Sequence, residues 1–393
     1  MSNHQRFVEL SQFFRDRLIN DTVPFWVRHA VDRTYGGYTF FLGRDGELLS
    51  SDKAMWTHGR ATWLFSKLYN DLERRPDWLE LSRHGADFIR KHGFDDSGRM
   101  YYSVTRDGRP LRQRRYVFTE VFAVLGLAEY AKASGDNAAL ELARATFDVI
   151  RDYTLNDKLP PKMVSETRQT RDHSLAMIQI DMLQVLRDAD PERDYSALID
   201  ERIDDVLTNF VRPDKEAVFE VVGPEGELLL DLPEGRWMNP GHAIETAWFI
   251  LEEARRRGDD ALAARAYPII DWALRRGWDE TYEGLLYFID VEGKQQPSLE
   301  WDMKLWWPHN EAIYATLLAY HMSGKDEYYA WFEKILSYSL SHFPDHQFGE
   351  WIGYLHRDGS VAIDLKGNMW KGPFHLPRQQ LYCHKLLEEM TAK

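Results

Sequence analysis

Cysteine, long apolar runs and positive charge are the features that this 393-residue sequence has least of. Cys383 is the single cysteine, so no intrachain disulfide and no cysteine-based zinc site can form, and we expect a reducing cytoplasm. No run approaches the roughly 18 apolar residues that would span a membrane, and the N-terminus lacks an uninterrupted signal-peptide core. The net charge of −14 argues against nucleic acid and anionic membranes as partners.

Several common catalytic motifs are also missing. The sequence has no Walker loop, no GxGxxG after a strand, no HExxH and no GxSxG, which argues against phosphoryl transfer, dinucleotide redox, zincin and serine-hydrolase chemistry. What remains is histidine, arginine and carboxylate chemistry on a neutral small molecule. The aromatic fraction of 13% exceeds what a core needs, and aromatic rings that pack on C–H surfaces suit a sugar.

A turn signal, in which a glycine is followed by aromatics and then Asp-Gly or Glu-Gly, recurs along the chain. It is found in Tyr35–Glu47, Ser97–Arg109, Glu283–Lys294 and Gly349–Ser360. Each copy predicts a short β-hairpin. A weaker copy occupies Ala217–Leu228, and a copy expected near residue 160 is replaced by a loop. With roughly 62–65 residues per repeat, six units fill the chain.

Each unit contains two segments with helical periodicity. The predicted helices are 4–20, 55–73, 77–92, 117–134, 137–154, 172–189, 195–211, 242–257, 260–276, 308–323, 326–342 and 376–391. We expect them to pair in sequence order, with the second member of each pair the more buried one because it is richer in Ala, Leu, Met and Trp. This predicts an all-α protein, an (α/α)₆ toroid that forms a single domain over residues 1–393, with β-hairpins on its rim. An open helical solenoid is the alternative.

Polar groups gather where the predicted inner helices begin. They are Arg60, Glu120, His173, His242, Glu311, His375 and Arg378. In a closed ring these helix starts face one another, which favours the toroid over the solenoid and predicts a funnel that suits a sugar-sized ligand. The expected walls are Trp56, Trp63, Trp306, Trp307 and Phe374, and with Glu120 and His173 they form the predicted substrate-binding set.

His242 and His375 occupy matching positions in different repeats, each in a turn rich in Pro and Gly. The repetition favours a catalytic role over a capping role for His242. Partial positive charge at a helix N-terminus keeps a histidine neutral. Two neutral histidines on opposite walls would remove a proton from one face of a carbon and return it to the other, while Arg60 or Arg378 stabilises the oxyanion.

Two other classes of function stay open at this point. A glycoside hydrolase or lyase would need two carboxylates across a scissile bond, and the inner-helix starts offer Glu120 and Glu311. A non-catalytic binder would not need two histidines at equivalent positions. The paired histidines therefore favour proton transfer.

Five motifs together resemble the N-acylglucosamine 2-epimerases, also called renin-binding proteins, over nearly the whole chain. They are WxxGRxxW around Arg60, NPGHxIExxWF at Asn239–Phe249, MKLWWPHxEA at Met303–Ala312, GEWxGY at Gly349–Tyr354 and KGxFHxPR at Lys371–Arg378. The resemblance implies an (α/α)₆ barrel that interconverts N-acetylglucosamine and N-acetylmannosamine. The residues that it marks as essential are Arg60, His242, Glu311, His375 and Arg378.

The resemblance also implies a mechanism, in which the sugar ring opens, one of the two histidines removes the C2 proton and the other reprotonates the opposite face. It implies a homodimer that requires no metal or redox cofactor, with ATP as an activator of some members. The related mannose isomerases and cellobiose 2-epimerases make an aldose–ketose isomerase, or a 2-epimerase of unacetylated sugars, the alternative activity. Isomerase relatives carry a further active-site histidine in the third repeat, near which His173 lies.

Overall fold

The computed structural model describes residues 3–156, 158–160, 163–164 and 167–392. Its helices are α1 (Asn3–Arg17), α2 (Val23–His29), α3 (Met55–Asp71), α4 (Pro76–His92), α5 (Phe118–Ser134), α6 (Asn137–Leu155), α7 (His173–Ala189), α8 (Ser196–Asp205), α9 (Pro240–Arg257), α10 (Asp260–Gly277), α11 (Trp306–Ser323), α12 (Asp326–His342) and α13 (His375–Thr391). All twelve predicted segments are helical, within a few residues at each end. No helix in these described residues is long and apolar enough to cross a membrane.

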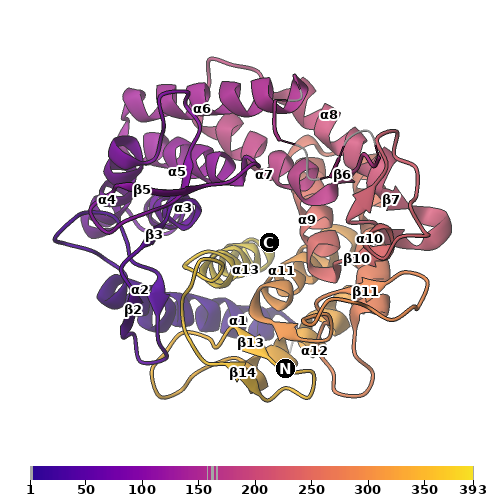
Figure 1. The fold of residues 1–393 in the computed structure, drawn as a ribbon. Helices are drawn as coiled ribbons and strands as arrows, with labels where there is room; N and C mark the ends of the chain where they lie inside the picture. Colours follow the sequence, from indigo (N-terminus) through magenta and orange to yellow (C-terminus); the bar gives the residue numbers. More distant parts are fainter. Residues whose placement is uncertain (1–2, 157, 161–162, 165–166, 393) are drawn as a thin grey trace.

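The helices form two concentric rings around one axis (Figure 1). The inner ring consists of α3, α5, α7, α9, α11 and α13, in which each helix contacts the next and α13 contacts α3. Helices α5 and α11 are buried on nearly every face, as expected for inner helices that are apolar all round. The closed ring confirms the predicted all-α (α/α)₆ barrel and excludes the open solenoid.

The expected pairing of each outer helix with the inner helix that follows it is wrong. Outer helices α4, α6, α8, α10 and α12 pack mainly on the inner helix that precedes them, and α1 packs on α13 at the end of the chain. The reason is loop length: α5 and α6 are separated only by Gly135 and Asp136, which forces an antiparallel hairpin, whereas the link from an outer helix to the next inner helix carries the rim segments. Because the first and last helices pack together, we propose that the chain acts as one domain.

The first helix is longer than predicted. A π-helical turn, Leu18–Thr22, joins α1 directly to α2, so the helical segment continues to His29. Pro24 lies just after this turn and has no N–H to donate to the preceding turn, which a wider π-turn accommodates. Gly135, Gly258 and Gly324 end α5, α9 and α11 with positive φ values of 75°, 65° and 69°.

Short strands connect neighbouring units on the rim. They are β1 (Phe41–Leu42), β2 (Leu48–Ser50), β3 (Lys53–Ala54), β4 (Tyr101–Val104), β5 (Pro110–Gln113), β6 (Arg171–Asp172), β7 (Val211–Arg212), β8 (Ala217–Val218), β9 (Val221–Val222), β10 (Trp237–Met238), β11 (Ile289–Asp290), β12 (Lys304–Leu305), β13 (Tyr354–Leu355) and β14 (Val361–Ile363). Antiparallel pairs β1–β2, β4–β5 and β13–β14 confirm three predicted hairpins. The hairpins expected at Ala217–Leu228 and Glu283–Lys294 do not form ladders of their own.

The strands of those two segments pair with strands of other segments instead. Strand β8 pairs with β7, β9 with β6, and β11 with β10. Strands β3, β6, β10 and β12 each lead directly into an inner helix, so these pairings fix where α3, α7, α9 and α11 begin. The loop expected near residue 160 lies partly outside the described residues.

A repeated ionic cluster secures the rim at three places. In each cluster, a buried aspartate forms ion pairs with a buried lysine and with a half-exposed arginine. The three clusters are Asp32 with Lys53 and Arg106, Asp279 with Lys304 and Arg357, and Asp345 with Lys366 and Arg44. Burial alone would raise the pKa of Asp279, but the hydrogen bonds from Arg357 and its neighbours hold it well below its usual value.

We expect Asp279→Asn to lower the free energy of unfolding at pH 7 by about 3 kcal/mol, because it leaves the buried Lys304 without its counter-charge. The native pKa of Asp279 is depressed, so its contribution is present above its unfolded pKa of about 3.9 and is lost as the pH falls. The difference between variant and wild type should therefore shrink below about pH 4. Urea unfolding at several pH values measures this difference in the free energy of unfolding. The control is Glu327→Gln, which removes an exposed ion pair and should change the free energy of unfolding by less than about 0.5 kcal/mol. An equal loss in both variants would contradict the assignment.

Candidate active site

A cavity of about 740 Å³ opens where the inner helices begin. Its walls are largely aromatic, and its polar groups include His242, Glu245, His375 and Arg60. Of the wall residues expected from the sequence, Trp56, Trp306, Trp307 and Phe374 line it. A cavity of this size with apolar walls and few polar groups is typical of a small-molecule site.

His242 lies in the first turn of α9 and reaches the cavity. The side chain of Asn239 caps this helix, because its Oδ1 accepts a hydrogen bond from the backbone N–H of His242 at 3.1 Å. The imidazole of His242 is therefore not the cap. The ring atom Nδ1 lies 2.9 Å from Glu220 Oε2. Burial by itself would lower the pKa of His242, but the attraction of Glu220 and the hydrogen bond to it raise this pKa above 6.5. Glu220 therefore shifts the pKa of His242 in the direction opposite to the one expected from a helix N-terminus.

His375 is the first residue of α13, as the prolines and glycine around it predict. Its Nδ1 lies 2.6 Å from Glu311 Oε1. Burial, and then the nearby charge of Arg60, hold the pKa of His375 well below 6.5. The neutral form expected from the sequence is thus found, although the helix N-terminus is not the main cause.

Trp307 lies against both imidazoles. Its ring centroid is 5.1 Å from that of His242 and 5.5 Å from that of His375. Helix α11, which carries Trp307, lies between α9 and α13 in the inner ring. A ligand that stacks on this indole therefore meets both histidines.

Arg378 lies beneath the cavity and is 2% exposed. Its Nη2 contacts Glu245 and lies 2.8 Å from Glu311 Oε1, and its Nη1 lies 3.8 Å from Asp181 Oδ2. Burial would lower the pKa of this guanidinium, but Glu311 and Glu245 raise it above its ordinary value. Glu311 is held further by Trp248, whose Nε1 donates to Oε2 at 2.8 Å. Arg378 and Glu311 do not line the cavity, and Glu311 connects the guanidinium of Arg378 to the ring of His375.

Arg60 enters the cavity wall from α3. Its guanidinium stacks on Phe122 at 4.1 Å, on Trp56 at 4.7 Å and on Phe374 at 4.9 Å, measured to the ring centroids. No carboxylate in the described part of the chain forms an ion pair with it, and its Nε has no hydrogen-bond partner there. Burial lowers the pKa of Arg60 to about 9, so the group remains a cation at neutral pH. Arg60 is thus a cation that faces the cavity without a counter-charge of its own.

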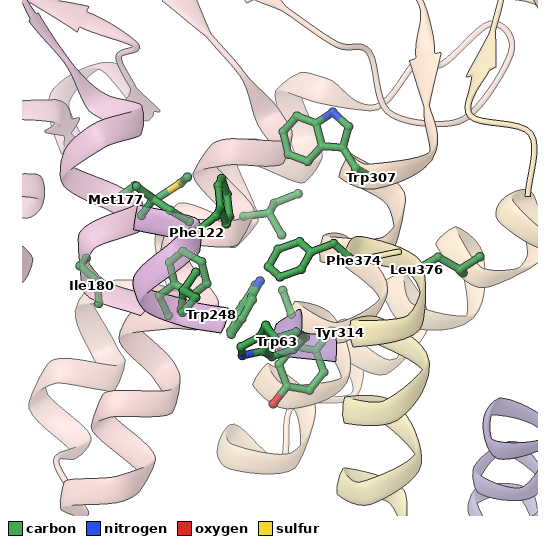
Figure 2. Packing of buried hydrophobic residues seen from close by; sticks show 14 of the residues in the cluster. Trp63, Phe122, Met177, Ile180, Trp248, Trp307, Tyr314, Phe374 and Leu376 are labelled. Carbon is green, nitrogen blue, oxygen red and sulfur yellow. The ribbon is translucent and has the colours of Figure 1, made fainter. Parts of the chain in front are cut away.

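Three of the predicted substrate-binding residues do not line the cavity. Glu120 is fully buried and lies 2.6 Å from Arg99 Nε. Trp63 packs against Phe374 at 5.2 Å between ring centroids, and Figure 2 shows it below Phe374, near Trp248 and Tyr314. His173 is buried behind His242. Neither Glu120 nor Glu311, the two carboxylates that the sequence offered for a hydrolase, lines the cavity.

His58 and His309, which share the inner-helix starts, are structural. Each Nε2 accepts from the backbone N–H of a rim residue, Tyr38 or Leu285, at 2.9 Å, and each Nδ1 bonds the carbonyl four residues earlier. Burial lowers the pKa of both to about 3. They connect the rim to the inner ring and do not face the cavity.

The family model for N-acylglucosamine 2-epimerase (GlcNAc 2-epimerase) matches residues 36–375. The chain belongs to the N-acylglucosamine 2-epimerase family. The N-acylglucosamine 2-epimerase of Bos taurus is 34% identical over 98% of this chain and 94% of its own length. The family assignment from the sequence motifs is thereby confirmed, and the protein is a carbohydrate epimerase.

More distant relatives are cellobiose 2-epimerases. The enzyme of Bacteroides fragilis is 24% identical over 97% of this chain and 99% of its own length. The solved structure of cellobiose 2-epimerase from Spirochaeta thermophila superimposes with a TM-score of 0.84 at 21% identity, covering 99% of each chain. At that identity the structural match shows the shared fold.

Within this epimerase, sequence reasoning missed Glu220 and several residues of the cavity wall. The missed wall residues include Tyr116, Phe118, Glu245, Tyr287, Glu300, Asn368 and Trp370. The available signal for Glu245 was its position about one helical turn after His242. Glu220 lies in the weak hairpin copy at Ala217–Leu228, and nothing local marks it.

Three groups near the cavity floor lie close enough to share a cation: Glu245, Glu311 and His375. The guanidinium of Arg378 already contacts both carboxylates. The guanidinium of Arg378 therefore already supplies the positive charge with which a metal ion would balance these two carboxylates. Arg378 also reaches toward Asp181, which lines a second, polar cavity of about 390 Å³ at the other end of the inner helices.

Proposed function

We propose that this epimerase interconverts N-acetyl-D-glucosamine and N-acetyl-D-mannosamine by proton transfer at C2 of the ring-opened sugar. The observation that carries the proposal is the pair His242 and His375, which flank Trp307 in one cavity with each Nδ1 bonded to a glutamate. A carboxylate only accepts hydrogen bonds, so each neutral imidazole keeps its proton on Nδ1 and leaves Nε2 as the base. Two such bases serve the two faces of one carbon.

Opening of the sugar ring exposes the C1 aldehyde, which acidifies the C2–H bond. One histidine takes the C2 proton, the electron pair moves onto the carbonyl oxygen, and the other histidine returns a proton to the opposite face. Arg60 is the group we assign to the resulting oxyanion, because it lines the cavity and has no ion-pair partner among the described residues. Arg378, committed to Glu245 and Glu311, is assigned to positioning His375.

The choice of acetamido sugars is supported by the curated relatives named N-acylglucosamine 2-epimerase, which are about one third identical over nearly the whole chain. The alternative is an unacetylated sugar, through 2-epimerisation or aldose–ketose isomerisation. More distant relatives named cellobiose 2-epimerase favour that second possibility. All of these reactions begin by removing the C2 proton to give an enolate. The isomerisation differs in where the proton returns, and the epimerisations differ in which sugar the cavity admits.

Proton NMR of the purified protein in D₂O, without added metal, separates these activities. We expect N-acetylmannosamine to yield N-acetylglucosamine deuterated at C2. Mannose and cellobiose serve as competing substrates under the same conditions. If the acetamido sugar stays unchanged while mannose yields fructose or glucose, or cellobiose is epimerised, the alternative replaces the proposal.

The pH dependence of the reaction follows from the opposite shifts of the two histidines. In the active form, one of the two histidines is an imidazolium and the other is neutral. This form prevails at pH values between the lowered pKa of His375 and the raised pKa of His242. We expect a bell-shaped profile of kcat/KM with an acid limb below pH 6.5 and a basic limb above it. The profile should have the same shape for both epimers, because both directions start from one-proton forms. A single limb near pH 6.5 would contradict the pairing.

Three further expectations from the sequence belong to this proposal. We infer a homodimer, a cytoplasmic location and no requirement for a metal or redox cofactor, with ATP as an activator. Light scattering of the purified protein decides the oligomeric state. Assays with a chelator and with added ATP test the expectations about the metal and the activator. Inactivation by the chelator would overturn the expectation that no metal is required.

A further inference from the structure

We propose that Glu220 is the positioning residue for His242: its carboxylate fixes the imidazole with Nε2 toward the cavity and compensates the charge that His242 carries as a proton donor. The inference rests on the proposed proton transfer by His242 and extends it to a residue outside the cavity. Glu220 does not line the cavity. It therefore acts through the histidine and not on the sugar.

The backbone holds Glu220 firmly in place. It lies between β8 and β9, where its N–H donates to the carbonyl of Trp237 at 2.9 Å and its carbonyl accepts from the N–H of His173 at 2.9 Å. Trp237 belongs to β10, which leads toward α9, and His173 is the first residue of α7. Both bonds connect Glu220 to the starts of inner helices. The carboxylate is thus fixed relative to the helix that carries His242.

The side chain of Glu220 divides its two oxygens between two histidines. Oε2 lies 2.9 Å from His242 Nδ1, and Oε1 lies 3.5 Å from His173 Nδ1. His173 Nε2 lies 3.1 Å from the hydroxyl of Thr246, which donates to the carbonyl of His242 at 2.8 Å. At 3.5 Å the contact between Oε1 and His173 Nδ1 is no hydrogen bond, so the anchor that His173 provides is its backbone N–H, which donates to the carbonyl of Glu220. His173 does not line the cavity.

The charge around Glu220 differs from the charge around Glu311, although both bond a histidine. Glu311 shares its charge with Arg378 and also accepts from Trp248. Glu220 has no arginine or lysine partner in the described part of the chain, and the contacts of its carboxylate are the two imidazoles. Its negative charge is therefore available to stabilise a protonated His242. The charge of Glu220 raises the pKa of His242, whereas burial and the charge of Arg60 lower the pKa of His375.

Other titratable groups surround His242, and none of those in the described ranges of the chain bonds its ring. They are Glu245 on α9, His173 on α7, His375 on α13 and Tyr287 on the rim loop, besides Glu220 itself. Glu245 adds to the attraction of Glu220 but is bonded to Arg378. Replacing Glu220 should therefore remove most of the stabilisation of the protonated ring.

Histidine NMR tests the inference without any substrate. In the full-length protein labelled at its histidines, His242 is assigned by loss of its signal in His242→Asn. We expect Glu220→Gln, which keeps a hydrogen-bond acceptor and removes the charge, to lower the titration midpoint of His242 by about 1–3 pH units. Glu225→Gln is the matched control, because Glu225 is exposed in the turn that follows β9, and it should leave the midpoint unchanged.

Activity gives an independent readout. In Glu220→Gln, the basic limb of kcat/KM should move to lower pH while the acid limb stays, so the rate on the alkaline side falls about 10-fold for each pH unit of the shift. A loss of activity by the same factor at every pH, with the midpoint of His242 unmoved, would overturn the inference and leave Glu220 a purely structural residue.

A second variant covers the case in which Glu220→Gln does not fold. Glu220→Asp keeps the charge at a greater distance, and we expect a smaller shift of the His242 midpoint in the same direction together with a lower kcat. An unchanged midpoint in Glu220→Asp with normal kcat would also contradict the inference. If the wild-type protein epimerises none of the sugars named above, the proposed function fails, whereas the His242 titration still decides what Glu220 does.

Discussion

His242→Asn and His375→Asn should each lower the rate of epimerisation by about 10²–10⁴-fold, the range expected for the loss of a general acid or base. The reason is that, in the proposed mechanism, each Nε2 serves one face of C2 and the other histidine does not replace it. Neither substitution should unfold the protein, because both side chains border the cavity. His346→Asn, at an exposed position, should leave the rate unchanged.

Deuterium exchange at C2 makes this prediction specific to a two-base mechanism. Each single variant retains one base, so it should exchange the C2 proton of one epimer with D₂O without converting it, and the two variants should exchange opposite epimers. The double variant should exchange neither. Equal exchange of both epimers in both single variants would show that one base suffices, and the assignment of the pair would then be wrong.

Arg378→Met should cost about 3–5 kcal/mol of folding free energy at neutral pH, because it leaves Glu245, Glu311 and Asp181 buried around no cation. Burial already raises the pKa of Asp181 to about 7 with the arginine present. Without a cation, burial and mutual repulsion favour the neutral form of a carboxyl group and so raise its pKa above the unfolded value. Activity should fall as well, since Glu311 loses the guanidinium that holds it beside His375.

The sign of the pH dependence distinguishes this explanation from a simple packing defect. Groups with raised native carboxyl pKa values destabilise the variant as the pH rises from about 4 through those values. The stability gap between Arg378→Met and wild type should therefore be larger at pH 7.5 than at pH 5. Urea unfolding at both pH values measures it, and the added substitution Glu245→Gln should recover part of the loss. Arg6→Met, at a surface ion pair, should cost less than about 1 kcal/mol.

Much of the candidate site could be predicted because its signals are local. A Pro/Gly-rich turn before a helix marks both His242 and His375, and the Trp306–Trp307 pair before Glu311 marks α11. The roles within the site were harder to predict. Arg60 and Arg378 looked equivalent in sequence, yet one faces the cavity without an ion-pair partner and the other is enclosed by carboxylates.

Glu220 shows why part of the site escaped sequence analysis. It is 22 residues from His242 along the chain, in the segment whose hairpin signal is weakest. The strand pairing predicted for that segment was local, whereas β8 and β9 pair with β7 and β6. Only those non-local pairings bring the carboxylate of Glu220 to the ring of His242.

The sequence by itself determined the positions of the helices to within a few residues except at the first, the inner and outer helices, three of the hairpins, the family and the two cavity histidines. Each depends on neighbours within a few turns of the chain, where periodicity, capping and turn chemistry act. The tertiary structure alone decided which outer helix packs on which inner one, which arginine lines the cavity and which carboxylate lies beside each histidine. These outcomes depend on burial and on charges that lie far apart in sequence, because desolvation and Coulomb attraction depend on distance in space.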